Sequence, residues 1–422
     1  MSTPTKAKPH GPIPHYFRAA DDGMMVIGGE RADDLVSRAG DTPLFVYDVD
    51  IVRQRIAALR AAMPAQLGIH YAIKANSHPD FLRAVRPMVD GFDVASGGEA
   101  TKAMAAGMAP DAISFAGPGK RDRELEQAIG AGVTLNLESA GEARRALAIG
   151  ERLGVTPRLA VRVNPDFDLK GSGMRMGGGA KPFGVDAADA APLVRSIINA
   201  GADWRGFHIF AGSQALDPAS IIETQAATVA LATALSDTIG SVPPVVNLGG
   251  GFGVPYFPAD TALDIVPIGA ALAEALDNSP LSQTAAHFAI ELGRYIAAEC
   301  GVYLTRIVDR KVSHGECFLV VDGGLHHQLA ASGNFGTVIR RNYPIAIANH
   351  FDAERTEIVH VVGCLCTPLD RLGDQVLMPA AGEGDLVALF MAGAYGASAS
   401  PSAFLGHPEP IEMVIDAGHR RQ

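Results

Sequence analysis

The feature of this sequence that most constrains its fold is an alternation of short β-rich runs with Ala/Leu-rich segments of helical period. Each run ends in a Gly, Asn, Ser or Asp turn. The eight runs occupy residues 67–74, 91–96, 112–117, 133–139, 158–165, 206–212, 244–250 and 287–294. Such alternation predicts parallel strands joined by crossover helices. Eight units over about 230 residues predict an α/β fold, a (β/α)8 barrel, because closure leaves no exposed strand edge.

The pattern changes after Arg294, where β-rich runs follow one another with turns and few helical periods. This predicts a mostly antiparallel β domain. The β-like run at 44–50 precedes the barrel and is expected to join that sheet. We therefore expect an N-terminal segment of the β domain at 1–46, a barrel at 47–296 and a C-terminal β domain at 297–422.

Charge and cysteine content narrow the function classes. The chain has 35 basic and 46 acidic residues, a net charge of -11, which gives no global support for binding nucleic acid. Four cysteines in 422 residues are too few for a secreted disulfide scaffold. The first residues contain no apolar signal region, and no apolar run approaches about 18 residues. We expect a cytoplasmic protein with no membrane or nucleic-acid partner.

Reactive residue types collect where the predicted strands end, and in such a barrel these ends share one mouth. Lys74 closes the first run, where desolvation would lower its pKa and make it a Schiff-base nucleophile; a lysine that only reaches to solvent is the alternative. The glycines 249–251 lie at the end of the seventh run and could bring bare N–H groups to a phosphate. Glu291 and Arg294 end the eighth run, where an ordinary ion pair is the alternative.

Six motifs occur in the order seen in a known family: YAIKAN, FDVASGGE, NLGGGFG, ELGR, GCLCTPLD and GAYGASASPSAF. The chain thereby resembles, over roughly residues 42–416, the fold type III decarboxylases that use pyridoxal 5'-phosphate (PLP). These include the diaminopimelate and ornithine decarboxylases and have an alanine-racemase-like barrel. The stretches FAGPGKRD, NPDFDLKGSGMRMGGG and GFHIFAGSQ look closest to the decarboxylases of exosortase A systems and to that of butirosin biosynthesis.

The resemblance implies a role for each matching position. Lys74 would hold PLP covalently, and His208 would stack on its ring, although a hydrogen-bonded core histidine is the alternative. Asp93 and Arg162 would support the Lys74 region or serve the fold alone. The residues implied to hold the phosphate are Gly249, Gly250, Gly251, Arg294, Ser213 and Tyr395. The Ser213 role is weakened because the segment from His208 to Ser213 is two residues longer than in the family.

Within this resemblance, Glu291 is the residue that separates decarboxylation from racemisation. A carboxylate beside the pyridine nitrogen keeps that nitrogen protonated, so the ring can accept the electron pair released when carbon dioxide leaves. Alanine racemases place an arginine there. Glu291 therefore favours decarboxylation over racemisation.

The segment GCLCTPLD matches the family pattern through Gly363, Cys366 and Asp370. The resemblance implies that Cys366 donates a proton to the substrate carbon from the partner side of a site shared in a homodimer. Cys364 occupies a proline position of the pattern and is interpreted as a packing residue. A Cys-x-Cys metal clip lacks a second ligand pair in the sequence, so no metal is expected.

The residue after Cys366 is usually acidic in the amino-acid decarboxylases and pairs with the distal ammonium of the substrate, but here it is Thr367. A neutral hydroxyl cannot balance a buried ammonium, which disfavours ornithine, lysine and diaminopimelate. The stretch from Gly323 to Pro344 is longer than in diaminopimelate decarboxylases. Thr367, Asp370, Arg340 and Tyr343 are the candidate substrate contacts, with solvated surface as the alternative for the arginine.

These observations predict a PLP-dependent carboxy-lyase that acts on an α-amino carboxylate, which the butirosin relative suggests is tethered to an acyl carrier protein. Arg340 and Arg341 are candidates for a basic patch that would meet an acidic carrier. The alternatives are a decarboxylase of free amino acids of the diaminopimelate type, an amino-acid racemase and a non-catalytic PLP-binding homologue.

Overall fold

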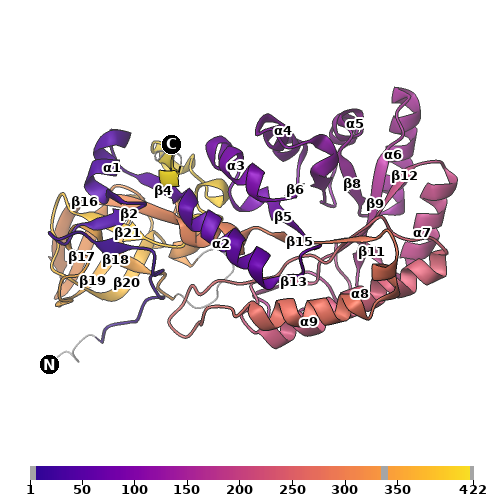
Figure 1. The fold of residues 1–422 in the computed structure, drawn as a ribbon. Helices are drawn as coiled ribbons and strands as arrows, with labels where there is room; N and C mark the ends of the chain where they lie inside the picture. Colours follow the sequence, from indigo (N-terminus) through magenta and orange to yellow (C-terminus); the bar gives the residue numbers. More distant parts are fainter. Residues whose placement is uncertain (1–5, 334–340, 419–422) are drawn as a thin grey trace. The chain divides into compact units, whose positions relative to one another are not determined.

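The computed structural model describes residues 6–333 and 341–418, and these form two compact units (Figure 1). Among these residues, the barrel unit comprises 55–254 and 262–296, and the β unit comprises 6–54, 255–261, 297–333 and 341–418. The domain boundaries expected at residues 46 and 296 stay a prediction. None of the helices within the described ranges combines the length and apolar character that a membrane crossing requires.

The barrel unit contains a closed ring of eight parallel strands, which confirms the predicted fold. The strands follow the order β9-β12-β14-β15-β5-β6-β7-β8, and β8 pairs with β9 to close the ring. Their bounds are β5 Gly68–Ala72, β6 Gly91–Val94, β7 Ile113–Phe115, β8 Thr134–Leu137, β9 Arg158–Asn164, β12 Asp203–Ile209, β14 Val245–Asn247 and β15 His287–Leu292. Each strand falls within or overlaps one of the eight predicted runs. Most strand residues are buried, as expected for strands covered on both faces.

Helices connect successive barrel strands (Figure 1). Their bounds are α3 Pro79–Val85, α4 Gly97–Ala105, α5 Asp122–Ala131, α6 Ala140–Leu153, α7 Ala187–Asn199, α8 Pro218–Ile239 and α9 Val266–Asp277. At the starts of α4 and α6, the hydroxyls of Ser96 and Ser139 accept hydrogen bonds from the N–H groups of Glu99 and Glu142. These serines therefore begin both helices as the Ser-x-x-Glu spacing indicates.

The β unit is built on a mixed sheet in which five of seven strand pairings are antiparallel. Its main path is β18-β21-β16-β17-β19-β20, and β4 pairs with both β16 and β22. The bounds are β4 Leu44–Asp48, β16 Gly301–Ser313, β17 Glu316–Val321, β18 Ile345–Ile347, β19 Glu357–Val362, β20 Arg371–Met378, β21 Leu386–Leu389 and β22 Ile411–Ile415. The long strand β16 joins β4, β17 and β21 and so forms the centre of the sheet.

Shorter elements complete the chain. A three-stranded sheet contains β1 Arg18–Ala19, β2 Met25–Ile27 and β3 Glu30–Arg31. The helices α1 Ala32–Ala39, α2 Val49–Ala62 and α10 Arg294–Ala297 each follow a strand closely in sequence. The glycine-dense loop at 170–184 contains β10 Met174–Arg175, which pairs with β13 Gly212–Ser213, and it leads into β11 Val185–Asp186 beside β9. The loop is thereby paired with the segment that follows β12.

Candidate active site

Lys74 lies directly after β5 on a 3-10 turn, Ile73–Ala75. Ile73 and Ala75 are buried, whereas the Lys74 side chain is exposed, so burial does not supply the expected desolvation. Its Nζ lies 5.6 Å from the centre of the Phe210 ring, which follows β12. The charge of Lys74 also acts on the carboxylate of Glu291 in β15. The amine therefore lies where β5, β12 and β15 end.

Glu291 is the centre of a buried polar cluster. Its Oε2 lies 2.8 Å from Nε2 of His208 and accepts a hydrogen bond from the Asn247 side chain at 3.2 Å. Asn247 in turn accepts a hydrogen bond from the N–H of Gly249 at 2.9 Å. His208 and Asn247 are direct neighbours in the parallel pairing of β12 and β14. Strand register thus brings together groups that lie up to 83 positions apart in the chain.

The charges around Glu291 keep its carboxylate ionised. Burial alone would raise the pKa of Glu291, but the attraction and hydrogen bond of His208 and the charges of Lys74 and Arg162 lower it well below its ordinary value. Because the ionised carboxylate of Glu291 can only accept a hydrogen bond, Nε2 of His208 is the donor in this contact. Its other ring nitrogen, Nδ1, is buried and has no hydrogen-bond partner among the described residues. His208 is therefore held by one edge, with the other nitrogen unused.

The loop after β14 requires its glycines because other strand ends approach it closely. A Cβ on Gly250 would lie 2.0 Å from the Glu291 carbonyl oxygen, and one on Gly249 would lie 2.5 Å from that of Ile209. Gly249 and Gly251 adopt φ values of 71° and 98°, which side chains rarely allow. Within 6–333 and 341–418, the N–H groups of Gly250 and Gly251 have no hydrogen-bond acceptor. The loop therefore offers two uncommitted donors at the barrel mouth.

Ser213 and Arg294 come from segments that flank this glycine loop. A Cβ on Gly251 would lie 2.9 Å from the carbonyl oxygen of Gly212, so the backbone beside Ser213 packs against the loop. Arg294 is the first residue of α10 and follows β15 after a single glycine. Ser213, Arg294 and the two uncommitted backbone donors thus lie in segments that follow barrel strands at one rim. This combination suits an anionic group such as a phosphate.

Arg162 and Asp93 have partners of their own within the barrel. Arg162 forms an ion pair of 2.7 Å with Glu138, and both side chains are buried. Glu138 also accepts hydrogen bonds from the N–H groups of Gly117 and Gly184. Asp93 Oδ2 lies 3.4 Å from Nδ1 of His70. These contacts fit a role in the fold, while the charge of Arg162 still reaches Glu291.

Three predicted site residues in the β unit have a partly or fully accessible side chain. Cys366 is exposed, and Thr367 is half-buried in the same turn. The Thr367 hydroxyl accepts a hydrogen bond from the Leu369 N–H at 3.3 Å. Tyr395 is half-buried and adopts a φ of 55°, which is uncommon for a residue other than glycine. Such backbone conformations persist only where the surrounding structure holds them, and they cluster at functional sites.

The other predicted substrate contacts are placed differently. Both carboxylate oxygens of Asp370 accept backbone hydrogen bonds, from Leu325 at 2.7 Å and from Leu365 at 2.8 Å. Asp370 is buried, so a role in holding these two loops fits it better than a substrate contact.

Tyr343 is also buried, and its ring stacks on that of Tyr256 with centres 4.8 Å apart. Arg341 places its guanidinium 3.6 Å from the centre of the Phe257 ring. Arg340 lies outside the described residues.

Two groups of polar residues come together without a sequence motif that marks them as sites. Lys120 and Glu142 form a buried ion pair of 2.7 Å in the barrel unit, next to the Arg162 and Glu138 pair. In the β unit, Cys364 lies beside His407. Only the Ser-x-x-Glu opening that contains Glu142 gives a signal, and it indicates a helix start. No local pattern connects the other residues, because they meet only in the folded chain.

Comparison with known proteins shows that this chain is similar to the pyridoxal-dependent decarboxylases. The pyridoxal-binding domain of the pyridoxal-dependent decarboxylases matches residues 49–298. The L-glutamyl-[BtrI acyl-carrier protein] decarboxylase of Niallia circulans is 39% identical over 384 residues, covering 89% of this chain and 89% of that protein. The diaminopimelate decarboxylase of Methanothermobacter thermautotrophicus is 30% identical over 410 residues, covering 94% and 92%.

A solved structure agrees with both the barrel and the β unit. The diaminopimelate decarboxylase of Helicobacter pylori complexed with L-lysine matches with a TM-score of 0.80 and 27% identity. The match covers 91% of this chain and 94% of that one. The similarity therefore extends over both units and is not restricted to the barrel.

Proposed function

Since the chain belongs to the family of pyridoxal-dependent decarboxylases, we propose that its substrate is an amino acid tethered to an acyl carrier protein. The chain is a PLP-dependent amino-acid decarboxylase. The observation that carries the proposal about the substrate is the 39% identity to a decarboxylase that acts on a carrier-bound glutamyl group, against 30% to a diaminopimelate decarboxylase. The comparison covers nine-tenths of each protein, so it involves the substrate loops as well as the barrel.

The loop from Gly363 to Asp370 supports this choice of substrate. Its single acidic residue, Asp370, already uses both oxygens for the N–H groups of Leu325 and Leu365. Thr367 offers a hydroxyl where free diamino acids would need a negative charge beside their distal ammonium. An unbalanced ammonium is costly to desolvate, whereas an amide or thioester end carries no such charge. The loop therefore suits a substrate whose far end is neutral.

The barrel mouth fits PLP by the chemistry of its donors. The free N–H groups of Gly250 and Gly251, with Ser213 and Arg294, would hold the phosphate, and Lys74 would hold the aldehyde carbon. When bound, PLP supplies the electron sink that accepts the electron pair left on the substrate by departing carbon dioxide.

Glu291 would hold a proton in this site, and His208 is oriented by its contact with Glu291. The hydrogen bonds from His208 and Asn247 both end at Oε2 of Glu291, so Oε1 is left to hold a proton at the pyridine nitrogen. The His208 ring is fixed by its bond to Glu291, which orients its face for stacking. The exposed Cys366 thiol would deliver the proton that replaces the carboxylate on the substrate carbon.

We further propose a cytoplasmic homodimer in which Cys366 acts at the partner's barrel. The four cysteines form no disulfide, which agrees with a reducing compartment. Mixing the inactive variants Lys74→Ala and Cys366→Ala after subunit exchange should restore about a quarter of wild-type activity, since half the dimers then carry one intact site. If subunits exchange but mixing does not restore carbon dioxide release, while each variant remains dimeric, Cys366 acts within its own chain.

The substrate proposal is tested by carbon dioxide release from matched pairs of free and carrier-bound amino acids. We expect kcat/KM for a glutamyl thioester on a carrier protein to exceed that for free glutamate and diaminopimelate by about 100-fold or more. The variant Thr367→Glu should raise the use of diaminopimelate, because it restores a charge for the distal ammonium. Equal or faster turnover of free amino acids by the wild type would refute the carrier proposal and leave the decarboxylase assignment intact.

A further inference from the structure

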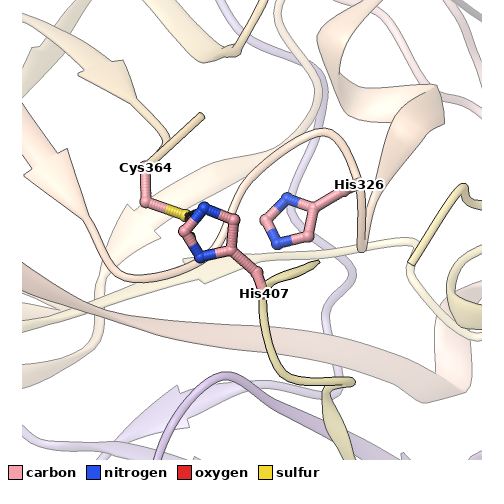
Figure 2. A group of neighbouring side chains, drawn as sticks. All are labelled: His326, Cys364 and His407. Carbon is pink, nitrogen blue, oxygen red and sulfur yellow. Dashed lines mark hydrogen bonds between the residues drawn. The ribbon is translucent and has the colours of Figure 1, made fainter. Parts of the chain in front are cut away.

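Three side chains able to ligate a transition metal meet in the β unit, and neither the fold nor the proposed function uses them (Figure 2). His326 lies on the loop after β17, Cys364 on the loop after β19 and His407 on the loop before β22. Their ligand atoms all lie within 4.8 Å of one another. Figure 2 shows the Cys364 sulfur directed at the His407 ring, with the His326 ring beside it.

His326 is the strongest sign that this cluster lacks a partner. Its side chain is completely buried at 0% exposure, yet neither ring nitrogen has a hydrogen-bond partner among the described residues. Buried polar atoms in folded proteins are almost always paired, so two unpaired nitrogens in one ring require an explanation. The adjacent His327 ring cannot pair with it, because its nitrogens already contact the Tyr303 hydroxyl at 3.0 Å and the Pro408 carbonyl at 2.9 Å.

The spacing of Cys364 and His407 suits shared coordination of one ion. Bond lengths of about 2.3 Å for Zn–S and 2.0 Å for Zn–N place sulfur and nitrogen about 3.6 Å apart in a tetrahedral site. In the structure, the Cys364 sulfur lies 3.8 Å from Nδ1 and 3.9 Å from Nε2 of His407. Neither nitrogen is singled out as the partner of the thiol, so a turn of the ring can direct one of them at a bound ion.

Neighbouring groups hold the three loops in place. Asp370 accepts hydrogen bonds from the N–H groups of Leu325 and Leu365, the residues next to His326 and Cys364. His327 contacts the carbonyl of Pro408, the residue after His407. The three candidate ligands are thus fixed through backbone contacts of their direct neighbours. Such supporting contacts are what orient ligands in metal sites.

We propose that His326, Cys364 and His407 bind one zinc ion and leave its fourth position open to water or another ligand. Two imidazoles and one thiolate are ligands that zinc prefers, whereas magnesium and calcium prefer oxygen. Binding releases the Cys364 proton to solvent, since zinc takes the thiolate. The ion would fix the loop that continues to Cys366 and Thr367.

The test measures metal content and coordination in the untagged, PLP-loaded protein. We expect about one zinc per chain in the wild type, and at least tenfold less in Cys364→Ser and His407→Asn after dialysis against trace metal. Cys366→Ser is the matched control, because it removes a thiol two residues away on the same loop and should keep the zinc. Lys74→Ala should also keep it, which separates the ion from the cofactor and from the proposed substrate.

Replacement of zinc by cobalt supplies a second measurement. Tetrahedral cobalt gives intense visible d–d bands, and a bound thiolate adds a charge-transfer band that Cys364→Ser should lose. The proposal is overturned if the wild type takes up neither metal, if Cys364→Ser binds as the wild type does, or if Cys366→Ser loses the ion. Circular dichroism verifies that each variant folds, and PLP content gives a second check for every variant except Lys74→Ala, which is expected to lose the cofactor. If Cys364→Ser does not fold, the cobalt spectrum of the wild type decides alone.

Discussion

Two buried carboxylates, one in each unit, have pKa values shifted in opposite directions. Glu291 in the barrel is 7% exposed and Asp370 in the β unit is 3% exposed, so both lose most of their contact with water. Burial raises the pKa of Asp370, and two backbone hydrogen bonds and the charge of His407 do not fully offset this. The pKa of Glu291 falls, because His208, Lys74 and Arg162 outweigh burial.

The difference lies in the kind of partner. Asp370 has backbone donors, which fix the positions of loops without supplying a full charge. Glu291 has a histidine at 2.8 Å and the charges of Lys74 and Arg162, which stabilise an anion that can act on a proton. A buried carboxylate surrounded by cationic groups is expected at a reacting centre, and one held by backbone N–H groups is expected in a scaffold.

Removal of Lys74 should have the largest effect, because it takes away both the covalent hold on PLP and a charge that favours ionised Glu291. Lys74→Ala is expected to lower kcat by roughly 1000-fold or more and to lose PLP on gel filtration, as followed by the absorbance of the bound cofactor. Lys102→Ala is the control, since Lys102 is exposed on α4 and donates a hydrogen bond to the hydroxyl of Ser77. Retention of wild-type absorbance in Lys74→Ala would remove Lys74 from this role.

Glu291→Gln tests whether the charge of Glu291, rather than its shape, matters. We expect a fall in kcat on the order of 100-fold with PLP still bound, since the neutral amide cannot hold a proton at the pyridine nitrogen. Glu274→Gln on the exposed face of α9 is the control, and it should leave kcat unchanged.

The same variant should change how stability depends on pH. The folded pKa of Glu291 lies below its ordinary value of 4.5, so ionised Glu291 contributes stability above pH 4.5 that is lost as pH falls through the folded pKa. The difference in unfolding free energy between wild type and Glu291→Gln should therefore shrink on acidification. Denaturant titrations across this pH range measure it, and a constant difference would contradict the lowered pKa.

The sequence predicts the barrel and its mouth better than it predicts the side-chain clusters of the β unit. The barrel follows from a local pattern along the chain, and the clusters do not. Strands alternate with helices along the chain, so the order of the runs alone assigns the ends at Lys74, Gly249 and Glu291 to one rim. The contact between Cys364 and His407 spans 43 positions and follows no repeat. In the sequence, Cys364 occupies a proline position of the family pattern, which favours a packing residue, and no second ligand pair indicates a metal site.

The hydrogen bonds of Asp370 are equally hidden from the sequence. Its match to the family pattern suggests a contact with substrate, but its acceptors are filled by the N–H groups of Leu325 and Leu365. Leu365 lies five positions away and Leu325 forty-five, so only the folded loops reveal the pairing. Motifs thus identify where chemistry collects, and the three-dimensional contacts separate reacting groups from supporting ones.

Asp370→Asn tests the carboxylate that is held by backbone N–H groups, and it should have the smallest effect on the reaction of the variants considered. One of the two backbone N–H groups then faces an amide donor in place of an acceptor, which should cost about 1–3 kcal/mol of unfolding free energy while kcat changes by less than about tenfold. The same variant also tests how stability depends on pH. Because the folded pKa of Asp370 lies above its ordinary value of 3.8, the wild type loses stability as pH rises from 3.8 through the folded pKa. The deficit of Asp370→Asn should therefore shrink as pH rises, opposite in sign to Glu291→Gln. Denaturant midpoints of both variants over one pH series decide this, and a deficit that grows with pH would mean that Asp370 is held as an anion after all.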